Sequence, residues 1–188
     1  MDYLSREGSP IPESLWEKID DAVTKAASKI LTGRRFINIY GPLGAGVQSI
    51  NVDNISELEE TEGDISVIKG RTYRHIPLIN QDFSILWRDL ETSEKIGMPV
   101  DLSSAVNAAT QCALKEDQLI FFGSEELGYK GLMNEDGIVK LPMSDWNDGE
   151  NPFKDIAAGL SKFIENGIVG RKALVVSPDV YVKLQRIQ

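Results

Sequence analysis

The sequence has few of the residues on which metal binding, disulfide bonding and nucleophilic catalysis depend. It contains one cysteine, Cys112, and one histidine, His75. A single cysteine forms no disulfide within the chain, and this pair of residues matches no zinc-ligand spacing and no Cys–His catalytic motif. Cys112 lies in an apolar run, where a buried, unreactive thiol is the usual outcome. We therefore expect a reducing compartment, no metal site and a structural role for both residues.

Long apolar runs and an excess of basic residues are also missing. Apolar stretches such as 119–122 are far too short to span a bilayer, and the first residues lack the apolar core of a signal peptide. The 20 Lys and Arg residues against 29 Asp and Glu give a formal net charge of -9. This net negative charge disfavours sequence-independent binding to the phosphates of a nucleic acid. The sequence therefore predicts a cytoplasmic protein that binds neither a membrane nor nucleic acid.

The rest of the composition is that of an ordinary globular protein. The 188 residues suit one domain or two small ones. A hydrophobic fraction of 41% and a charged fraction of 26% differ from the low hydrophobicity and high charge of disordered chains. The chain carries no internal repeat and no low-complexity segment. We expect it to fold around an apolar core.

The spacing of apolar side chains predicts four helices, at 13–32, at 101 to about 117, at 153–164 and at 177–187. Pro12 and Gly33 bound the first helix, and Asp101 or a neighbouring serine is the predicted N-cap of the second. Short β-prone pieces predict extended segments at 49–52, 65–68, 73–79, 82–88, 137–142 and 173–176. The acidic stretch 57–64 predicts a solvated tip on a long hairpin-like excursion.

Motifs for catalysis are missing from this framework. The glycine-rich segment 41–46 lacks the Lys-Ser/Thr of a P-loop, and Ser49 stands where the dinucleotide fingerprint needs Gly or Ala. None of the candidate nucleophilic serines lies in a Gly-x-Ser-x-Gly elbow; these are Ser103, Ser124 and Ser177. The carboxylate pairs 116–117 and 125–126 are sequence neighbours, and the sequence leaves open whether either faces a cleft. On its residues, a structural or assembly protein outranks an enzyme.

Five stretches, in one order along the chain, resemble the shell proteins called encapsulins. They are GRRFINIYGPLGAGVQS at 33–49, DFSILWRDL at 82–90, EDQLIFFG at 116–123, GYKGLM at 128–133 and LVVSP at 174–178. The resemblance covers nearly the whole chain, from the N-terminal helix to Gln188. Several motifs of this length in one order are far more specific than any single pattern above.

The resemblance implies an α+β, tailed-phage major-capsid-like fold. It divides the chain into an N-terminal helix and arm at 1–45, an extended loop at 46–80, a peripheral lobe with a spine helix at 81–123 and an axial lobe at 124–188. Encapsulins continue past the equivalent of Gln188, so the resemblance implies an incomplete axial lobe and a missing C-terminal third. The sequence leaves open whether the chain is a fragment, one half of a split shell or a natural truncation.

In function, the resemblance implies a subunit that self-assembles into an icosahedral shell, an encapsulin nanocompartment, in the cytoplasm. Such shells enclose cargo enzymes, often ferritin-like iron oxidases for iron storage or dye-decolorising peroxidases, which are captured by a C-terminal peptide of the cargo. The shell itself is not the catalyst. The sequence leaves cargo identity, shell size and pore chemistry open.

By position, the resemblance places a cargo-peptide groove between the N-terminal helix and the peripheral lobe. Ile30 and Leu31 would supply apolar contact, Ala27 a shallow floor, and Arg34 and Asn38 polar contacts. A groove of this kind binds through apolar anchors and main-chain hydrogen bonds, and many copies per shell strengthen a modest contact. The alternative is that Ile30 and Leu31 are core residues. Asn38 falls where relatives carry an acidic residue, which leaves the charge of the peptide open.

Further implications of the resemblance concern a cofactor and other activities. Some encapsulins bind flavin near a tryptophan in the region of Trp87. The family has also been described as linocin-like bacteriocins with peptidase activity, which makes an enzyme the alternative function. A capsid relative that packages nucleic acid would need a basic interior patch, for which Arg34 and Arg35 are the clearest local pair.

Overall fold

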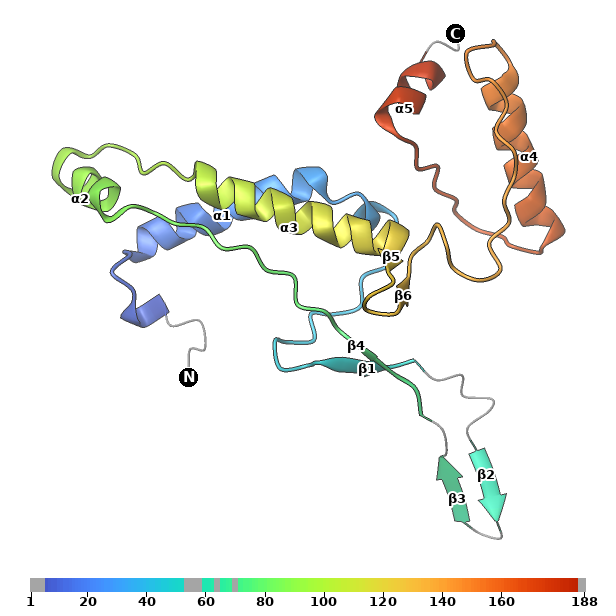
Figure 1. Cartoon of the computed structure of the whole chain (residues 1–188), viewed down its shortest axis with the longest axis horizontal. Helices are drawn as coiled ribbons and strands as arrows, with labels where there is room; N and C mark the ends of the chain where they lie inside the picture. Colours follow the sequence, from blue (N-terminus) through green and yellow to red (C-terminus); the bar gives the residue numbers. More distant parts are fainter. Residues whose placement is uncertain (1–5, 53–58, 63–64, 69–70, 186–188) are drawn as a thin grey trace. The chain divides into compact units, whose positions relative to one another are not determined.

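The computed structural model describes residues 6–52, 59–62, 65–68 and 71–185. It divides the chain into two compact units, Met1–Leu132 and Met133–Gln188. Within the described residues, the first unit holds α-helices α1 to α3 and three two-stranded antiparallel sheets, and the second holds α4 and α5 (Figure 1). The expected α+β class is confirmed, whereas the four-part division at 1–45, 46–80, 81–123 and 124–188 stays a prediction.

Two long helices, α1 (Glu13–Ile30) and α3 (Ser103–Phe122), lie side by side and form the core of the first unit (Figure 1). The buried side chains at their interface are two large ones from α1 and four alanines from α3: Leu15, Ile19, Ala105, Ala108, Ala109 and Ala113. Small side chains let two helix axes approach closely. The helix predicted at 13–32 is confirmed and ends at Ile30.

The ends of α3 differ from the prediction. The helix starts at Ser103 with Leu102 as its N-cap, and the Asp101 carboxylate accepts a hydrogen bond from the Ser103 backbone N–H at 2.9 Å. The predicted end near Asp117 is wrong, because the helix continues to Phe122 and stops at Gly123, where φ is 71°. No glycine or proline interrupts 118–122. The last turn also brings the Phe121 ring to 6.1 Å from that of Phe36.

The sequence reasoning missed a helix, α2 (Trp87–Ile96). The predicted extended segment 82–88 is therefore wrong at its last two residues. Asp89 lies in the first turn, where a negative charge is favourable, and Gly97 ends the helix in the left-handed conformation at φ 74°. Lys95 and Glu91, one turn apart, form an ion pair at 2.6 Å that supports the helix.

The strands form short hairpin-like pairs. β1 (Ser49–Asn51) pairs with β4 (Tyr73–His75), β2 (Glu59–Glu62) with β3 (Ile65–Ile68), and β5 (Gly123–Ser124) with β6 (Tyr129–Lys130), all antiparallel. These pairings confirm the predicted strands at 49–52 and 65–68 and the first part of the one predicted at 73–79. The predicted solvated tip at 57–64 lies partly outside the described residues.

The second unit contains α4 (Asn151–Glu165) and α5 (Pro178–Leu184). Both predicted helices are confirmed; the second ends at Leu184, and residues 186–187 of its predicted range lie outside the described residues. The strands predicted at 137–142 and 173–176 are wrong, since neither stretch is part of a sheet. A β-strand needs a hydrogen-bonded neighbour, and apolar character alone supplies none. Leu174, in the second of these stretches, is 57% exposed.

A carboxylate on α4 organises the loop before it. The Asp155 Oδ2 atom accepts hydrogen bonds from the Trp146 indole Nε1 at 2.7 Å and from the Ser144 backbone N–H and hydroxyl, each at 2.8 Å. These bonds lower the pKa of Asp155, with the Trp146 hydrogen bond as the largest cause. Trp146 is buried, and the loop around it is fixed to α4 by these bonds.

Candidate functional site

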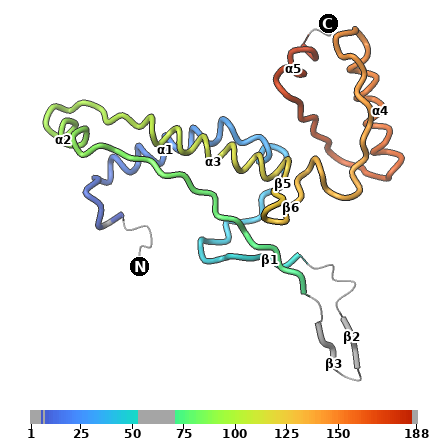
Figure 2. Tube along the Cα trace, viewed as in Figure 1, coloured from blue at the N-terminus to red at the C-terminus, as the bar shows by residue number. Residues whose placement is uncertain are grey.

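A groove of about 440 Å³ runs between α1, α3 and the segment 79–83. Figure 2 shows this segment as part of the trace that leads from β4 past the paired helices toward α2. Alanines of α3 and Ala27 of α1 line the groove, with larger apolar side chains beside them: Val23, Leu31, Ile79 and Phe83. Polar side chains are few, and they include Thr24 and Gln81. The groove is therefore shallow and mostly apolar.

The helix period explains how these residues come together. Val23, Ala27 and Leu31 are each four residues apart, so they follow one face of α1 and its end. The lining residues of α3 repeat at the same three- and four-residue spacing from Ala105 to Glu116. Two facing stripes with small side chains leave space between the helices that larger side chains would fill.

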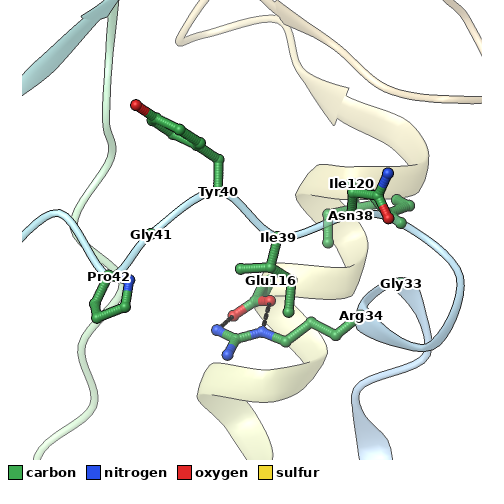
Figure 3. Close-up of a pocket in the computed structure, with 10 residues that line it drawn as sticks. Gly33, Arg34, Asn38, Ile39, Tyr40, Gly41, Pro42, Glu116 and Ile120 are labelled. Carbon is green, nitrogen blue, oxygen red and sulfur yellow. Dashed lines mark hydrogen bonds and ion pairs between the residues drawn. The ribbon is translucent and has the colours of Figure 1, made fainter.

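An ion pair forms one end of this groove. Arg34 binds Glu116 through two bonds, Nε to Oε1 at 2.6 Å and Nη2 to Oε2 at 2.7 Å (Figure 3). The Arg34 side chain is 51% exposed and that of Glu116 25% exposed. The bonds to Glu116 raise the pKa of Arg34 above its ordinary value. Two parallel bonds between a planar guanidinium and a carboxylate fix the direction of both side chains.

The same ion pair borders a second hollow, of about 500 Å³, on the arm that follows α1. Asn38, Ile39 and Pro42 are among its lining residues, and the Tyr40 side chain points away from α3 (Figure 3). Because Arg34 and Glu116 line both spaces, they lie between the groove and the second hollow.

The residue after Glu116 holds the backbone of the turn that leads to Arg34. The Asp117 carboxylate accepts hydrogen bonds from the N–H groups of Thr32 at 2.7 Å and Gly33 at 3.0 Å. Gly33 is buried against α3, and a Cβ atom there would lie 2.8 Å from the Ile120 Cδ1 atom. A larger residue at this position would require the Ile120 side chain to shift, and α3 fixes both the backbone of the turn and the Arg34 side chain.

Of the predicted groove residues, the structure brings Ala27, Leu31 and Arg34 together in the groove. Asn38 is exposed and lines the second hollow instead, and Ile30 is half-buried and lines neither space. The partner of Arg34, Glu116, was missed. It is 82 residues away in sequence, and the sequence carries no signal for so distant a pairing.

The other candidate residues form no catalytic arrangement in the described part of the chain. His75 is exposed on β4, and its backbone carbonyl accepts a hydrogen bond from the Tyr129 hydroxyl. Cys112 is half-buried and lines the groove, and the Ser103 hydroxyl donates to Asp101. Residues 6–52, 59–62, 65–68 and 71–185 contain no group of three or more His, Cys, Asp or Glu side chains placed to bind a metal ion.

The residue near which the resemblance implies a flavin, Trp87, is the first residue of α2. It is 66% exposed, and the Arg88 guanidinium lies 5.5 Å from its ring centre.

Among the described helices, none is both long and apolar enough to cross a bilayer.

Comparison with known proteins first defines the class of fold. The crystal structure of a virus-like particle from Pyrococcus furiosus matches this chain with a TM-score of 0.64 and 23% sequence identity, over 90% of this chain and 63% of that one. This similarity supports a capsid-like fold, in line with the tailed-phage major-capsid-like subunit expected from the sequence.

Sequence comparison then gives the family. The family described as "Encapsulating protein for peroxidase" matches residues 1–188, and the chain belongs to it. It is 38% identical to the type 1 encapsulin shell protein of Myxococcus xanthus, over 99% of this chain and 68% of the relative. It is 39% identical to a diheme-cytochrome–encapsulin shell fusion protein of Kuenenia stuttgartiensis, over 92% of this chain and 49% of the relative. The chain has the sequence of a shell subunit, since one of these relatives is named as an encapsulin shell protein and the other as an encapsulin shell fusion.

Proposed function

We propose that this chain assembles with copies of itself into a closed icosahedral shell and captures cargo protein by binding a C-terminal cargo peptide in the groove between α1 and α3. One observation carries the docking half of the proposal: Ala27, Leu31 and Arg34, predicted from the family resemblance, line one shallow apolar groove. The family description and the names of the relatives support the shell half. A cytoplasmic location is part of the same proposal.

Assembly is supported by large apolar side chains that the subunit leaves in solvent. Leu78 is 87% exposed, Ile96 is 73% exposed, and Ile164 at the end of α4 is 76% exposed. Such side chains can be buried by contacts with other chains when a shell assembles. Leu78 and Ile96 belong to the first unit and Ile164 to the second, so both units would contribute apolar contacts.

Native mass tests assembly. Sedimentation velocity and negative-stain imaging of the purified chain should show closed particles in the megadalton range. Leu78→Asp places a charge at an exposed apolar position and should lower the particle fraction, whereas Leu78→Met should not. A parent chain that stays a monomer or small oligomer at every concentration would contradict self-assembly of this chain.

Cargo docking would use the shape of the groove. Val23, Leu31 and Phe83 would contact two apolar side chains of an extended peptide, and the alanines would let its main chain lie close to α3. The side chains of Thr24 and Gln81 would form hydrogen bonds with the main chain of the peptide. Each contact is modest, so capture depends on the many identical sites of one shell.

Peptide binding tests docking. A fluorescein-labelled C-terminal peptide of a ferritin-like or peroxidase cargo, added before assembly, should bind the parent chain. Leu31→Asp should weaken binding about tenfold or more, because it places a charge against an apolar side chain. Leu31→Met is the matched control, and Arg34→Ala should also weaken binding. Equal affinity for the parent, Leu31→Asp and Arg34→Ala would remove this groove as the docking site.

Peptidase activity remains the alternative function, and no observation favours it. The described candidate residues are separate, with His75 on β4 and Cys112 in the groove. The chain, purified free of cargo and proteases, should not hydrolyse casein. Hydrolysis that is lost on His75→Ala would reverse the proposal.

Flavin binding at Trp87 also stays a prediction. The flavin absorbance of the purified chain, and its loss on Trp87→Ala, test it.

A further inference from the structure

The groove between α1 and α3 has an unusual charge composition for so acidic a chain. Among its lining residues only Arg34 and Glu116 are charged, and the others are apolar or neutral and polar. The formal charge of the whole chain is -9. Because the two charged groups bind each other through both carboxylate oxygens, the groove presents no unpaired charge. A ligand that fits it is uncharged where it lies against these residues.

Glu116 controls how Arg34 faces that ligand. It holds the Nε and Nη2 atoms of the guanidinium, which are two of its three nitrogens. Glu116 is the more buried partner, at 25% side-chain exposure against 51% for Arg34. An acidic ligand would have to compete with a carboxylate that already binds the Nε and Nη2 atoms of the guanidinium. A basic ligand would have to compete with an arginine that binds both oxygens of the Glu116 carboxylate.

We infer that Glu116 is the specificity-determining residue of the groove: by neutralising Arg34 it makes the groove select a cargo segment that carries no charge at this end. The inference rests on the proposed docking function and adds the charge class of the peptide. An interface discriminates against a charged ligand when binding of that ligand would break an ion pair that the interface already contains. Asn38, also near the pair and uncharged, adds no countercharge in the second hollow.

The test uses peptides that share one apolar pattern and differ in one residue. A panel of peptides of about ten residues, with two leucines at varied spacing in a Gly/Ser background, gives the best neutral binder. Single Glu and single Lys versions of that binder complete the set. Binding is measured by fluorescence anisotropy, at low and high salt, for the full chain and three variants: Glu116→Gln, Arg34→Gln and the double variant. Circular dichroism confirms that each variant keeps its helical content.

We expect each single variant to prefer a different peptide from the one that the parent prefers. The parent should bind the neutral peptide about fivefold or more tightly than either charged one, the size of a partly exposed charge effect. Glu116→Gln should favour the acidic peptide by a similar factor, because Arg34 is then unpaired, and salt should reduce that gain. Arg34→Gln should favour the basic peptide. The double variant should return to the neutral preference.

The two proposals fail in different ways. If no neutral peptide binds the parent, or if Leu31→Asp leaves its binding unchanged, the docking function is wrong. If the neutral peptide binds through Leu31 but Glu116→Gln leaves the order of the three peptides unchanged, docking stands and the role of Glu116 is overturned. A double variant that keeps a preference for the acidic peptide would also overturn it, because the preference would then come from another group.

Discussion

The carboxylate of Asp117 offers the sharpest test of how α3 holds the turn beside the groove. It accepts two backbone hydrogen bonds, from Thr32 at 2.7 Å and Gly33 at 3.0 Å, and the site is half-buried. A hydrogen bond to a charged group contributes about 1.5–3 kcal/mol, and water replaces part of this loss at a half-buried position. We expect Asp117→Ala to lower the free energy of unfolding by about 2–4 kcal/mol.

Asp117→Asn refines that prediction. The amide keeps one acceptor oxygen and loses the negative charge, so it can satisfy one of the two N–H groups. We expect a loss of about 1–2 kcal/mol, between the parent and Asp117→Ala. Glu126→Ala, at an exposed position outside α3, is the control and should change stability by less than about 0.5 kcal/mol.

Urea unfolding, followed by circular dichroism at one protein concentration and one assembly state, measures the three variants against the parent. Fixed concentration matters because assembly stabilises the folded subunit. The reasoning is refuted if Asp117→Ala falls within the range of Glu126→Ala. It is also refuted if Asp117→Asn is as costly as Asp117→Ala, since the remaining acceptor would then contribute nothing.

Two further predictions concern the β5–β6 hairpin and the second unit. Gly123→Ala should destabilise the first unit by about 3 kcal/mol or more, because a Cβ atom at φ 71° would lie 2.2 Å from the Tyr129 carbonyl oxygen; loss of protection in hydrogen exchange at 123–130 checks this. The folded-state pKa of Asp155 is lowered, chiefly by the Trp146 hydrogen bond, so its stabilising effect is present above the ordinary carboxyl pKa and lost as the pH falls through the lower folded value. Trp146 fluorescence should therefore report loosening of the second unit on acidification below about pH 4, and Asp155→Asn should show that loosening at neutral pH; identical acid profiles for parent and variant would contradict the assignment.

The helices were predictable where one amphipathic pattern and its end signals agree. The first helix has an apolar stripe, prolines before it and a glycine after it, and the structure gives Glu13–Ile30. The helix Trp87–Ile96 was missed because its sequence is short and mostly polar, with few apolar residues to reveal the helical spacing. The strands predicted at 137–142 and 173–176 are wrong for the opposite reason. Their apolar residues are typical of β-strands, but a strand also needs a neighbouring strand to hydrogen-bond with.

The groove was predictable only in part, because it combines a local signal with a distant one. Family resemblance placed Ala27, Leu31 and Arg34 on one helix end, and the helix period brings the first two to one face. The facing carboxylates come from 82 to 85 residues further along the chain. The sequence analysis left open what the adjacent acids Glu116 and Asp117 contact. Adjacent residues on a helix point in different directions, so each of the two has its own partner.

Those different directions give the two acids separate tasks. Asp117 binds the backbone at Thr32 and Gly33, whereas Glu116 binds the side chain of Arg34. Asp117→Asn should therefore lower stability and leave the order of neutral, acidic and basic peptides unchanged. Glu116→Gln should change that order with a small effect on stability, because exposed ion pairs contribute about 0–1 kcal/mol. If both variants lost stability and peptide preference together, the turn and the groove would form one coupled unit, and Glu116 would act on the peptide only by positioning Arg34.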